Sequence, residues 1–252
     1  MRVVIIGAGN VATVLGRRIK KAGHEILQVI SRSQESAKVL AKELGCNASN
    51  NFADIDKTGE LFLVAMSDAA LNELKEKINV GDKLVVHTAG SVCKDVLKDV
   101  SVNYGTLYPL QSLRKENPDE SIVIPILIDA INDYSIRIIN DFAISISPIV
   151  SYTQDDQRLK LHVGAVLTSN FANHLYCLAL EFCEKEKVDF KLLQPLIEET
   201  AARLKSQSPC DMQTGPAARK DVLTLDKHLR LLTAHPKLRT LYLRMTDSIM
   251  NP

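Results

Sequence analysis

The sequence lacks an excess of charge of either sign. Its 31 Lys and Arg residues are balanced by 30 Asp and Glu residues, which leaves a formal net charge of +1. A nearly neutral chain provides no broad electrostatic field that would attract nucleic acid or an anionic membrane. The expected partner is therefore a small molecule, with no nucleic acid and no membrane.

Long apolar runs and paired cysteines are also missing. No run approaches the roughly 20 residues needed to cross a bilayer, and the opening stretch MRVVIIGAG meets glycine too early for a signal peptide. These absences predict a cytoplasmic protein. The cysteines are odd in number and form no C-x-x-C pair, which disfavours a disulfide framework and a structural zinc site. Reduced thiols and no bound metal are predicted for Cys46, Cys93, Cys177, Cys183 and Cys210.

After residue 152 the sequence has few glycines and no strand-like pattern. Apolar residues there recur at intervals of three and four, most clearly over residues 161–186 and 192–205, and this spacing predicts helices. The length of 252 residues favours two modest domains. We therefore expect a boundary near residue 152, with one domain over 1–152 and a helical domain over 153–252.

The first part of the chain alternates short β-branched runs with helical stretches. Strands are predicted over residues 2–7, 25–31, 61–67, 83–90 and 121–129, with helices over 10–23 and 33–45 between them. A further helix and strand follow before residue 150. This alternation is typical of a parallel sheet covered by helices on both faces, so the predicted fold class is α/β followed by an all-α domain.

The sequence GAGNVA follows the first predicted strand and opens a helix. Gly7 permits a tight turn, and Gly9 leaves room for backbone to approach a pyrophosphate at the helix N-terminus. Ala12 stands where the glycine fingerprint requires only a small side chain. In this strand-turn-helix setting the motif predicts a dinucleotide-binding Rossmann domain. The alternative is a purely structural turn.

The second predicted strand ends in Ser31, Arg32 and Ser33, where an acidic residue would bind the 2′-hydroxyl of an adenosine ribose. A guanidinium and two hydroxyls suit a 2′-phosphate better. The segment therefore predicts NADP(H) as the cofactor. The alternative is an ordinary solvated arginine.

Polar residues also follow the other predicted strands, at the edge where ligands of such sheets collect. Ser67 either begins a helix as its N-cap or contacts the cofactor. His87 and Thr88 are candidates for the nicotinamide half of the cofactor. Tyr108 and Gln111 have a hydroxyl and an amide that would orient a polar substrate, or they serve packing alone.

A polar stripe occurs on the first long helix of the second domain. At 100° per residue, about a third of the circumference carries four polar side chains on an otherwise apolar helix, namely His162, Ser169, Asn170 and Asn173. Such a stripe must find hydrogen-bond partners or face a cavity. It therefore indicates either the wall of a substrate cleft or a network between helices.

Another helix is predicted to start near Pro216. Asp221 and His228 would share one face of it, seven residues apart, as a local contact or as part of a proton-transfer site. Arg219 would point elsewhere and bind an acidic group or cap a neighbouring helix. The spacing leaves these alternatives open.

Together the motifs GAGNVA, HTAGS, YPLQS, HVGAVLTSNFANHL and TGPAARKDVLTLDKHL resemble a known family. Its members combine a Rossmann-like domain with a C-terminal helical domain of unknown function 2520 and are labelled NADP oxidoreductases. More distantly, the chain is similar to pyrroline-5-carboxylate reductase, to deazaflavin-dependent NADP oxidoreductases and to the 6-phosphogluconate dehydrogenase group, whose C-terminal domain the helical part would resemble. The resemblance covers nearly the whole chain.

The resemblance implies that the cofactor is held by Gly7, Gly9, Asn10, Val11 and the segment 31–33. It also implies an active cleft between the domains and a homodimer formed through the helical domain. Two departures are evident. The family often has His where this chain has Tyr108, and the Lys-Asn pair of hydroxyacid dehydrogenases is replaced by Lys160 and Gly164.

These observations lead to one hypothesis and two alternatives. The chain is predicted to be an NADPH-dependent reductase of a C=O or C=N bond in a small polar metabolite. His162 would donate the proton, Asn170 and Asn173 would orient the substrate, and Asp221 with His228 would be the second candidates. The alternatives are an NADP-binding sensor without turnover and a deazaflavin-linked NADP oxidoreductase.

Overall fold

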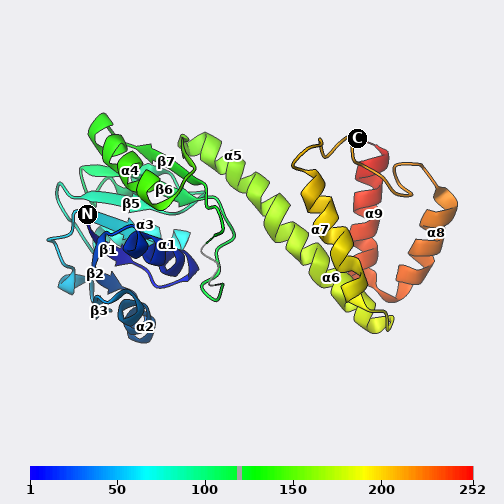
Figure 1. The fold of residues 1–252 in the computed structure, drawn as a ribbon, viewed down its shortest axis with the longest axis horizontal. Coiled ribbons are helices and arrows are strands. Elements are labelled where there is room, and N and C mark those ends of the chain that lie inside the picture. The colour runs from blue at the N-terminus through cyan, green and yellow to red at the C-terminus, as the bar shows by residue number, and fades with distance from the viewer. Residues whose placement is uncertain (118–120, 252) are drawn as a thin grey trace. The chain divides into compact units, whose positions relative to one another are not determined.

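The computed structural model describes residues 1–117 and 121–251. The chain divides into two compact units, Met1–Asn170 and Phe171–Pro252, and each is described by itself (Figure 1). The division falls between two helical residues and lies beyond the predicted boundary at residue 152. That boundary, with domains over 1–152 and 153–252, stays a prediction.

The first unit is built on an eight-stranded sheet with the order β3-β2-β1-β4-β5-β6-β7-β8. All neighbouring pairs are parallel except β6 and β7, which are antiparallel. The strands are β1 (Arg2–Ile6), β2 (Glu25–Ile30), β3 (Asn47–Ser49), β4 (Leu61–Val64), β5 (Leu84–His87), β6 (Asn103–Pro109), β7 (Ile126–Ala130) and β8 (Val150–Tyr152). The order reverses between β1 and β4, which is the switch point of a Rossmann sheet. The predicted α/β fold is confirmed.

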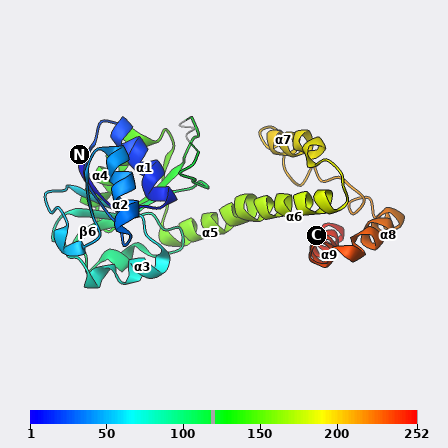
Figure 2. The same ribbon diagram turned by 90° about the horizontal axis from the view of Figure 1, so that it is seen from below.

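Helices cover both faces of this sheet. They are α1 (Asn10–Lys21), α2 (Gln34–Leu44), α3 (Asp68–Asn72) and α4 (Asp133–Ile146). Because side chains alternate along a strand, Val3 and Ile5 pack in one core with α1, α2 and α4, while Val4 and Ile6 pack in another with α3 and the short 3-10 turns. Figure 2 shows α1, α2 and α4 together over the sheet.

Local sequence sets the ends of these helices. Ser33 caps α2 by accepting a hydrogen bond from the Ser36 backbone N–H at 3.2 Å, and Gly45 ends the same helix with a φ of +76°. A left-handed residue at a helix end favours glycine. The predicted serine start and glycine stop of this helix are confirmed.

After β8 the described residues are mostly helical, as predicted, with turns over residues 204–221. Its elements are α5 (Asp155–Ala165), a π-helical segment (Val166–Phe171), α6 (Ala172–Lys185), α7 (Gln194–Arg203), α8 (Val222–Leu231) and α9 (Pro236–Met250). Short 3-10 turns occur at Phe52–Asp54, Leu74–Glu76, Lys94–Leu97, Phe190–Leu193 and Leu232–Ala234. Among the residues described, no helix combines the length and apolar character needed to cross a membrane.

The predicted helix start near Pro216 is wrong. Residues 216–219 form turns, Lys220 has a φ of +54°, and α8 begins only after Asp221. A non-glycine residue in the left-handed region interrupts a right-handed helix. Arg219 therefore lies outside the helix on which it was expected.

Candidate functional site

The turn after β1 is shaped by two glycines with different roles. Gly7 has a φ of +124°, and a Cβ there would lie 2.1 Å from the Ala65 carbonyl oxygen, so the turn touches the end of β4. Gly9 is the N-cap of α1, and a Cβ there would meet nothing within 4 Å. The open space at Gly9 lies in front of a helix N-terminus, where backbone N–H groups have no partner within the helix. This arrangement fits a bound pyrophosphate.

A cavity of about 310 Å³ opens at this turn, beyond the carboxyl ends of β1, β2 and β4. Its lining consists of Ile6, Gly7, Ala8, Gly9, Ile30, Ser31, Arg32, Ser36, Phe52, Ala65, Met66, Ser67 and Ala70. The glycine turn and the end of β2 thus lie on one cavity, as the sequence predicts. We name it the nucleotide cavity.

The Ser31–Ser33 segment is divided by the structure. Ser31 and Arg32 line the nucleotide cavity, whereas the Ser33 hydroxyl is engaged as the cap of α2. Ser36, on the first turn of α2, lines the cavity instead. The phosphate contact of the Ser33 side chain stays a prediction. The N-terminus of α2, the Ser36 hydroxyl and the Arg32 guanidinium form a set that suits a 2′-phosphate.

Asn10 and Val11 begin α1 but are not among the residues that line the nucleotide cavity, so their predicted cofactor contacts stay predictions. The Asn10 side chain accepts a hydrogen bond from the Lys115 N–H at 3.3 Å, and Val11 packs against the core. Ser67 is the N-cap residue of α3, its hydroxyl makes no capping hydrogen bond, and the residue lines the nucleotide cavity. Its predicted contact with the cofactor stays a prediction.

His87 and Thr88 have interior side chains. The His87 ring is fully buried, accepts a hydrogen bond from the Ala89 N–H at 3.2 Å and lies 3.3 Å from the Thr106 hydroxyl. Burial, with the nearby charge of Arg158, lowers the pKa of His87 to about 4. The Thr88 hydroxyl bonds to the carbonyl of Val64, at the end of β4. These side chains hold strand ends together, and the role predicted for both residues near the nicotinamide half of the cofactor stays a prediction.

A second cavity, of about 470 Å³, lies at the carboxyl end of β6 against α5 and the π-helical segment. We name it the substrate cavity. Its lining is Tyr108, Leu110, Gln111, Ser112, Leu161, His162, Gly164, Ala165, Val166, Thr168, Ser169 and Asn170. Five residues predicted from separate motifs are brought together here, namely Tyr108, Gln111, His162, Ser169 and Asn170. All of them belong to the first unit.

Tyr108 and His162 form a bonded pair in the wall of this cavity. The Tyr108 Oη atom lies 2.9 Å from His162 Nδ1, with the rings edge to face. A Cβ at Gly90 would lie 2.6 Å from that nitrogen, so only glycine lets the turn after β5 pack against the pair. Burial raises the pKa of the Tyr108 phenol, opposed by the charge of Arg158. The phenol stays neutral and can donate to Nδ1, which leaves the hydrogen of a neutral His162 on Nε2.

The π-helical segment explains why one residue of the predicted stripe is absent from the cavity. A π-turn takes i→i+5 hydrogen bonds and therefore rotates later residues out of the phase expected at 100° per residue. Ser169 and Asn170 line the cavity, but Asn173 follows in α6, where its amide lies 3.9 Å from Cys177 Sγ. Such insertions are often found at functional sites.

The pair expected between Asp221 and His228 does not form. The Asp221 carboxylate caps α8, accepting hydrogen bonds from the N–H and hydroxyl of Thr224 at 3.1 and 2.7 Å. His228 Nδ1 lies 2.7 Å from the Tyr242 hydroxyl on α9. Because Asp221 is the cap of α8, its side chain turns back onto the first helical turn.

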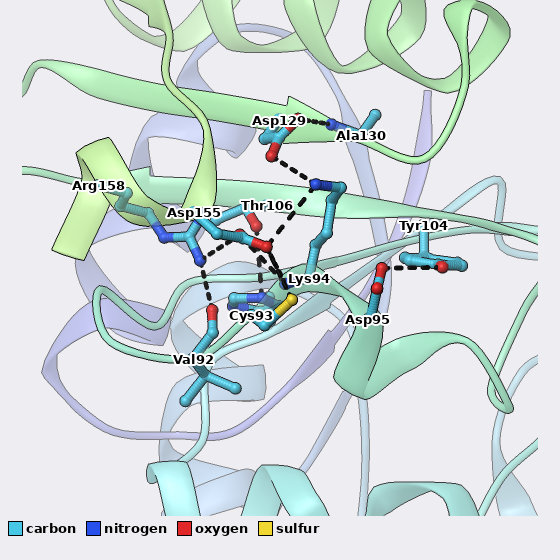
Figure 3. A network of polar contacts seen from close by, with 11 residues as sticks. Val92, Cys93, Lys94, Asp95, Tyr104, Thr106, Asp129, Ala130, Asp155 and Arg158 are labelled. Atoms are coloured by element: carbon cyan, nitrogen blue, oxygen red, sulfur yellow. Dashed lines mark hydrogen bonds and ion pairs between the residues drawn. The ribbon is translucent and has the colours of Figure 1, made fainter.

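A polar network that the sequence motifs did not indicate holds the start of α5 (Figure 3). The Arg158 side chain is 1% exposed, lies 2.7 Å from Asp155 Oδ1 and donates to the Val92 carbonyl. Asp155 Oδ2 accepts from the Cys93 thiol at 2.7 Å. Burial favours the neutral Asp155, but its hydrogen bonds from Cys93 and Arg158 outweigh this and lower its pKa. The network fixes α5 one turn before His162.

Lys94 extends this network to the sheet. Its ammonium lies 2.8 Å from the carboxylate of Asp129, whose side chain is 1% exposed, and 3.7 Å from that of Asp155. The one sequence signal for the network is the placement of Asp129 within the apolar strand ILIDA, because a buried carboxylate requires a partner. No motif points to Arg158.

A glycine turn at the switch point of a doubly wound sheet, with a polar cavity beside it, defines a dinucleotide-binding protein of the Rossmann type. Residues 2–90 match the family described as NADP oxidoreductase coenzyme F420-dependent, and residues 124–249 match the domain of unknown function 2520. The chain belongs to the NADP oxidoreductase family that joins these two parts. A search of curated proteins finds no match.

Solved structures agree with this assignment. The chain is 34% identical to a protein described as "putative NADP oxidoreductase" from Bacteroides fragilis, with a TM-score of 0.93 over 100% of this chain and 98% of that one. The fold is shared with 1-pyrroline-5-carboxylate reductase from Streptococcus pyogenes, at 15% identity and a TM-score of 0.66 over 100% and 99%. It is also shared with an imine reductase from Myxococcus stipitatus in complex with NADP+, at 15% identity and 0.63 over 99% and 92%.

Proposed function

We propose that this protein is a cytoplasmic NADPH-dependent reductase that transfers hydride to a C=O or C=N bond of a small polar metabolite, with His162 as the proton donor. The observation that carries the proposal is the Tyr108–His162 pair in the wall of the substrate cavity. This cavity and the nucleotide cavity both lie at the carboxyl edge of one sheet, where cofactor and substrate meet in such folds.

The residues of the nucleotide cavity fit NADP(H). The N-terminus of α1 and the open space at Gly9 would hold the pyrophosphate, while Arg32, Ser31 and Ser36 would surround the 2′-phosphate. When bound, the nicotinamide would supply hydride. The imine reductase that shares this fold is described with NADP+, which supports the same choice.

The Tyr108–His162 pair holds the imidazole ring in either protonation state, and the imidazolium form can transfer a proton to the substrate. In the imidazolium, Nδ1–H donates to the phenol oxygen and Nε2–H remains free to protonate a substrate atom. After that proton leaves, the phenol oxygen still accepts from Nδ1–H, so the ring keeps its place. Asn170, Ser169 and Gln111 would orient the substrate from the same cavity.

Four residues predicted from the sequence for the site have only a secondary place in this proposal. Asn173, Asp221, His228 and Arg219 stay predictions, without support from the geometry described above.

A homodimer formed through the helical domain is supported by exposed apolar side chains on its helices, including Leu192 at 79% and Leu223 at 80% exposure.

Two alternatives are separated from the proposal by experiment. An NADP-binding sensor would bind NADPH but consume none with any substrate. A deazaflavin-linked oxidoreductase is suggested by the family match over residues 2–90, and it would change the absorbance of an added deazaflavin in the presence of NADPH. Neither outcome is expected from the proposed reductase.

The test is NADPH oxidation by the purified protein with a panel of ketones and imines. Replacing His162 by Gln should lower turnover by about 10²-fold or more, because general acid catalysis contributes about that much. NADPH affinity, measured by nicotinamide fluorescence, should stay unchanged. The matched control is His174→Gln, at an exposed position on α6.

The two variants give a direct comparison. Near-normal turnover by His162→Gln would remove His162 from the mechanism. Loss of turnover in both variants would show that the effect comes from disturbing the helical run from α5 to α6 and not from the loss of the His162 imidazole.

A further inference from the structure

The lining of the substrate cavity is polar but carries no Asp, Glu, Lys or Arg among the residues that the structure describes around it. Its polar groups are the side chains of Tyr108, Gln111, Ser112, His162, Thr168, Ser169 and Asn170. Leucine, valine and alanine side chains form the remainder. This composition suits a ligand that is hydrogen-bonded and partly apolar.

An anionic substrate would have to be bound without a permanent cationic partner in this lining. Carboxylates and phosphates are normally held by paired Arg or Lys side chains, because desolvating an unpaired charge is costly. His162 is the one lining residue that can become cationic, and its proton is assigned to the reacting atom. A carboxylate beside it would compete for that proton.

The two cations that precede His162 on α5 are both paired with carboxylates, and Lys160 Nζ lies 2.6 Å from Asp156 Oδ2. Arg158 lies one turn before His162, but its side chain is 1% exposed and paired with Asp155. Its Nε and Nη1 atoms have no hydrogen-bond partner and are buried, so they are closed to a ligand in the cavity. Arg158 can influence the potential behind Tyr108 without touching the substrate.

Other arginines line a separate cavity. Arg17, Arg18 and Arg114 lie around a space of about 190 Å³ that shares Gln111 and Ser112 with the substrate cavity. Arg17 is paired with Glu43, and Arg18 donates to the Ile122 carbonyl. None of these three arginines is among the residues that line the substrate cavity.

We infer that the substrate of this site is a carbonyl or imine compound that carries no carboxylate or phosphate, with a hydrocarbon body and at most neutral hydrogen-bonding groups. The inference rests on the proposed reductase function. The inference sets this protein apart from the pyrroline-5-carboxylate reductase that shares the fold, because the substrate named for that enzyme bears a carboxylate.

The experiment compares matched pairs in the NADPH oxidation assay. 1-Pyrroline is paired with 1-pyrroline-5-carboxylate, and cyclohexanone with 4-oxocyclohexanecarboxylate. The uncharged member of each active pair should have a kcat/KM at least about tenfold higher, since burying an unpaired charge commonly costs more than a factor of ten. Equal or faster reduction of the carboxylated members would overturn the inference while leaving the reductase function intact.

Binding provides a second readout that does not depend on turnover. Calorimetry with NADP+-saturated protein compares prolinamide with proline, which differ in the carboxylate. Tighter binding of prolinamide supports the inference, and any other result overturns it. Absence of NADPH oxidation with every compound, together with selective binding of prolinamide, would reject the reductase function alone.

A cationic side chain introduced into the lining of the substrate cavity tests the inference, with a neutral side chain of similar length as its control. The side chain of Ser112 is exposed in this cavity, so Ser112→Arg should raise kcat/KM for the carboxylated member at least about tenfold relative to Ser112→Gln, which adds length without charge. Equal values for the two variants would show that the cavity does not discriminate by charge.

Discussion

At the scale of single residues, burial decides which polar side chains are free for chemistry. His87 stands at the end of a central strand and is fully buried, whereas His162 lines a cavity. The sequence presents both as histidines near a predicted site. Exposure depends on how β5, β6 and α5 pack, and this packing is not visible in either local motif.

His87 is expected to make stability depend on pH. Its folded pKa of about 4 lies below the ordinary value of 6.5, so below pH 6.5 the unfolded chain takes up a proton that the folded chain excludes. Its contribution is complete above pH 6.5 and declines as pH falls toward 4. The decline is about 1.4 kcal/mol for each pH unit within that window.

Urea unfolding of the protein and of His87→Asn between pH 4 and 7 measures this effect. The two free energies of unfolding should converge as pH falls, because the variant lacks the titrating ring. Exposed His174, replaced in the same way, serves as the control and should leave the pH dependence unchanged. Parallel curves for the protein and His87→Asn would refute the assignment.

At the scale of elements, the start of α5 is held by a buried ion pair. Arg158→Met removes the buried guanidinium and leaves Asp155 with only the Lys94 ammonium at 3.7 Å, which should lower the free energy of unfolding by about 3 kcal/mol. The double variant Arg158→Met/Asp155→Asn should recover part of this loss, since no unpaired charge remains. The measurement is a double-mutant cycle by denaturant unfolding.

A surface pair gives the comparison for this cycle. Arg203 and Glu199 form an exposed i,i+4 pair on α7, and Arg203→Met should cost less than about 0.5 kcal/mol. If the two arginine variants were equally stable, the buried network would have no special role in holding α5.

Secondary-structure elements could be predicted from the sequence more fully than the contacts of individual side chains. The strands at 2–6, 25–30, 61–64 and 84–87 follow directly from apolar runs, and Ser33 with Gly45 marks both ends of α2. The prediction that one polar stripe faces a cleft was partly correct, because His162 on α5 shares a cavity with Ser169 and Asn170 on the π-helical segment. Asn173 departs from it because the π-helical segment changes the helical phase, and residue spacing alone contains no signal for that insertion.

At the scale of the whole molecule, the apolar side chains exposed on the second unit form the surface through which the proposed homodimer would assemble. Leu192, Leu196 and Leu223 are between 63% and 80% exposed in the single chain. We expect a dimer at micromolar concentration in sedimentation velocity. Leu192→Glu/Leu223→Glu should shift the protein to monomer, because a buried unpaired carboxylate opposes association.

Val39 provides the control for this surface, since it is 64% exposed but lies on α2 in the first unit. Val39→Glu should leave the sedimentation coefficient unchanged. A protein that is monomeric at every concentration would contradict the predicted dimer.

The nucleotide cavity and the substrate cavity both belong to residues 1–170. The parts proposed for hydride and proton transfer therefore come from one continuous stretch of sequence. A mutagenesis library aimed at the lining of either cavity can be confined to residues 1–170.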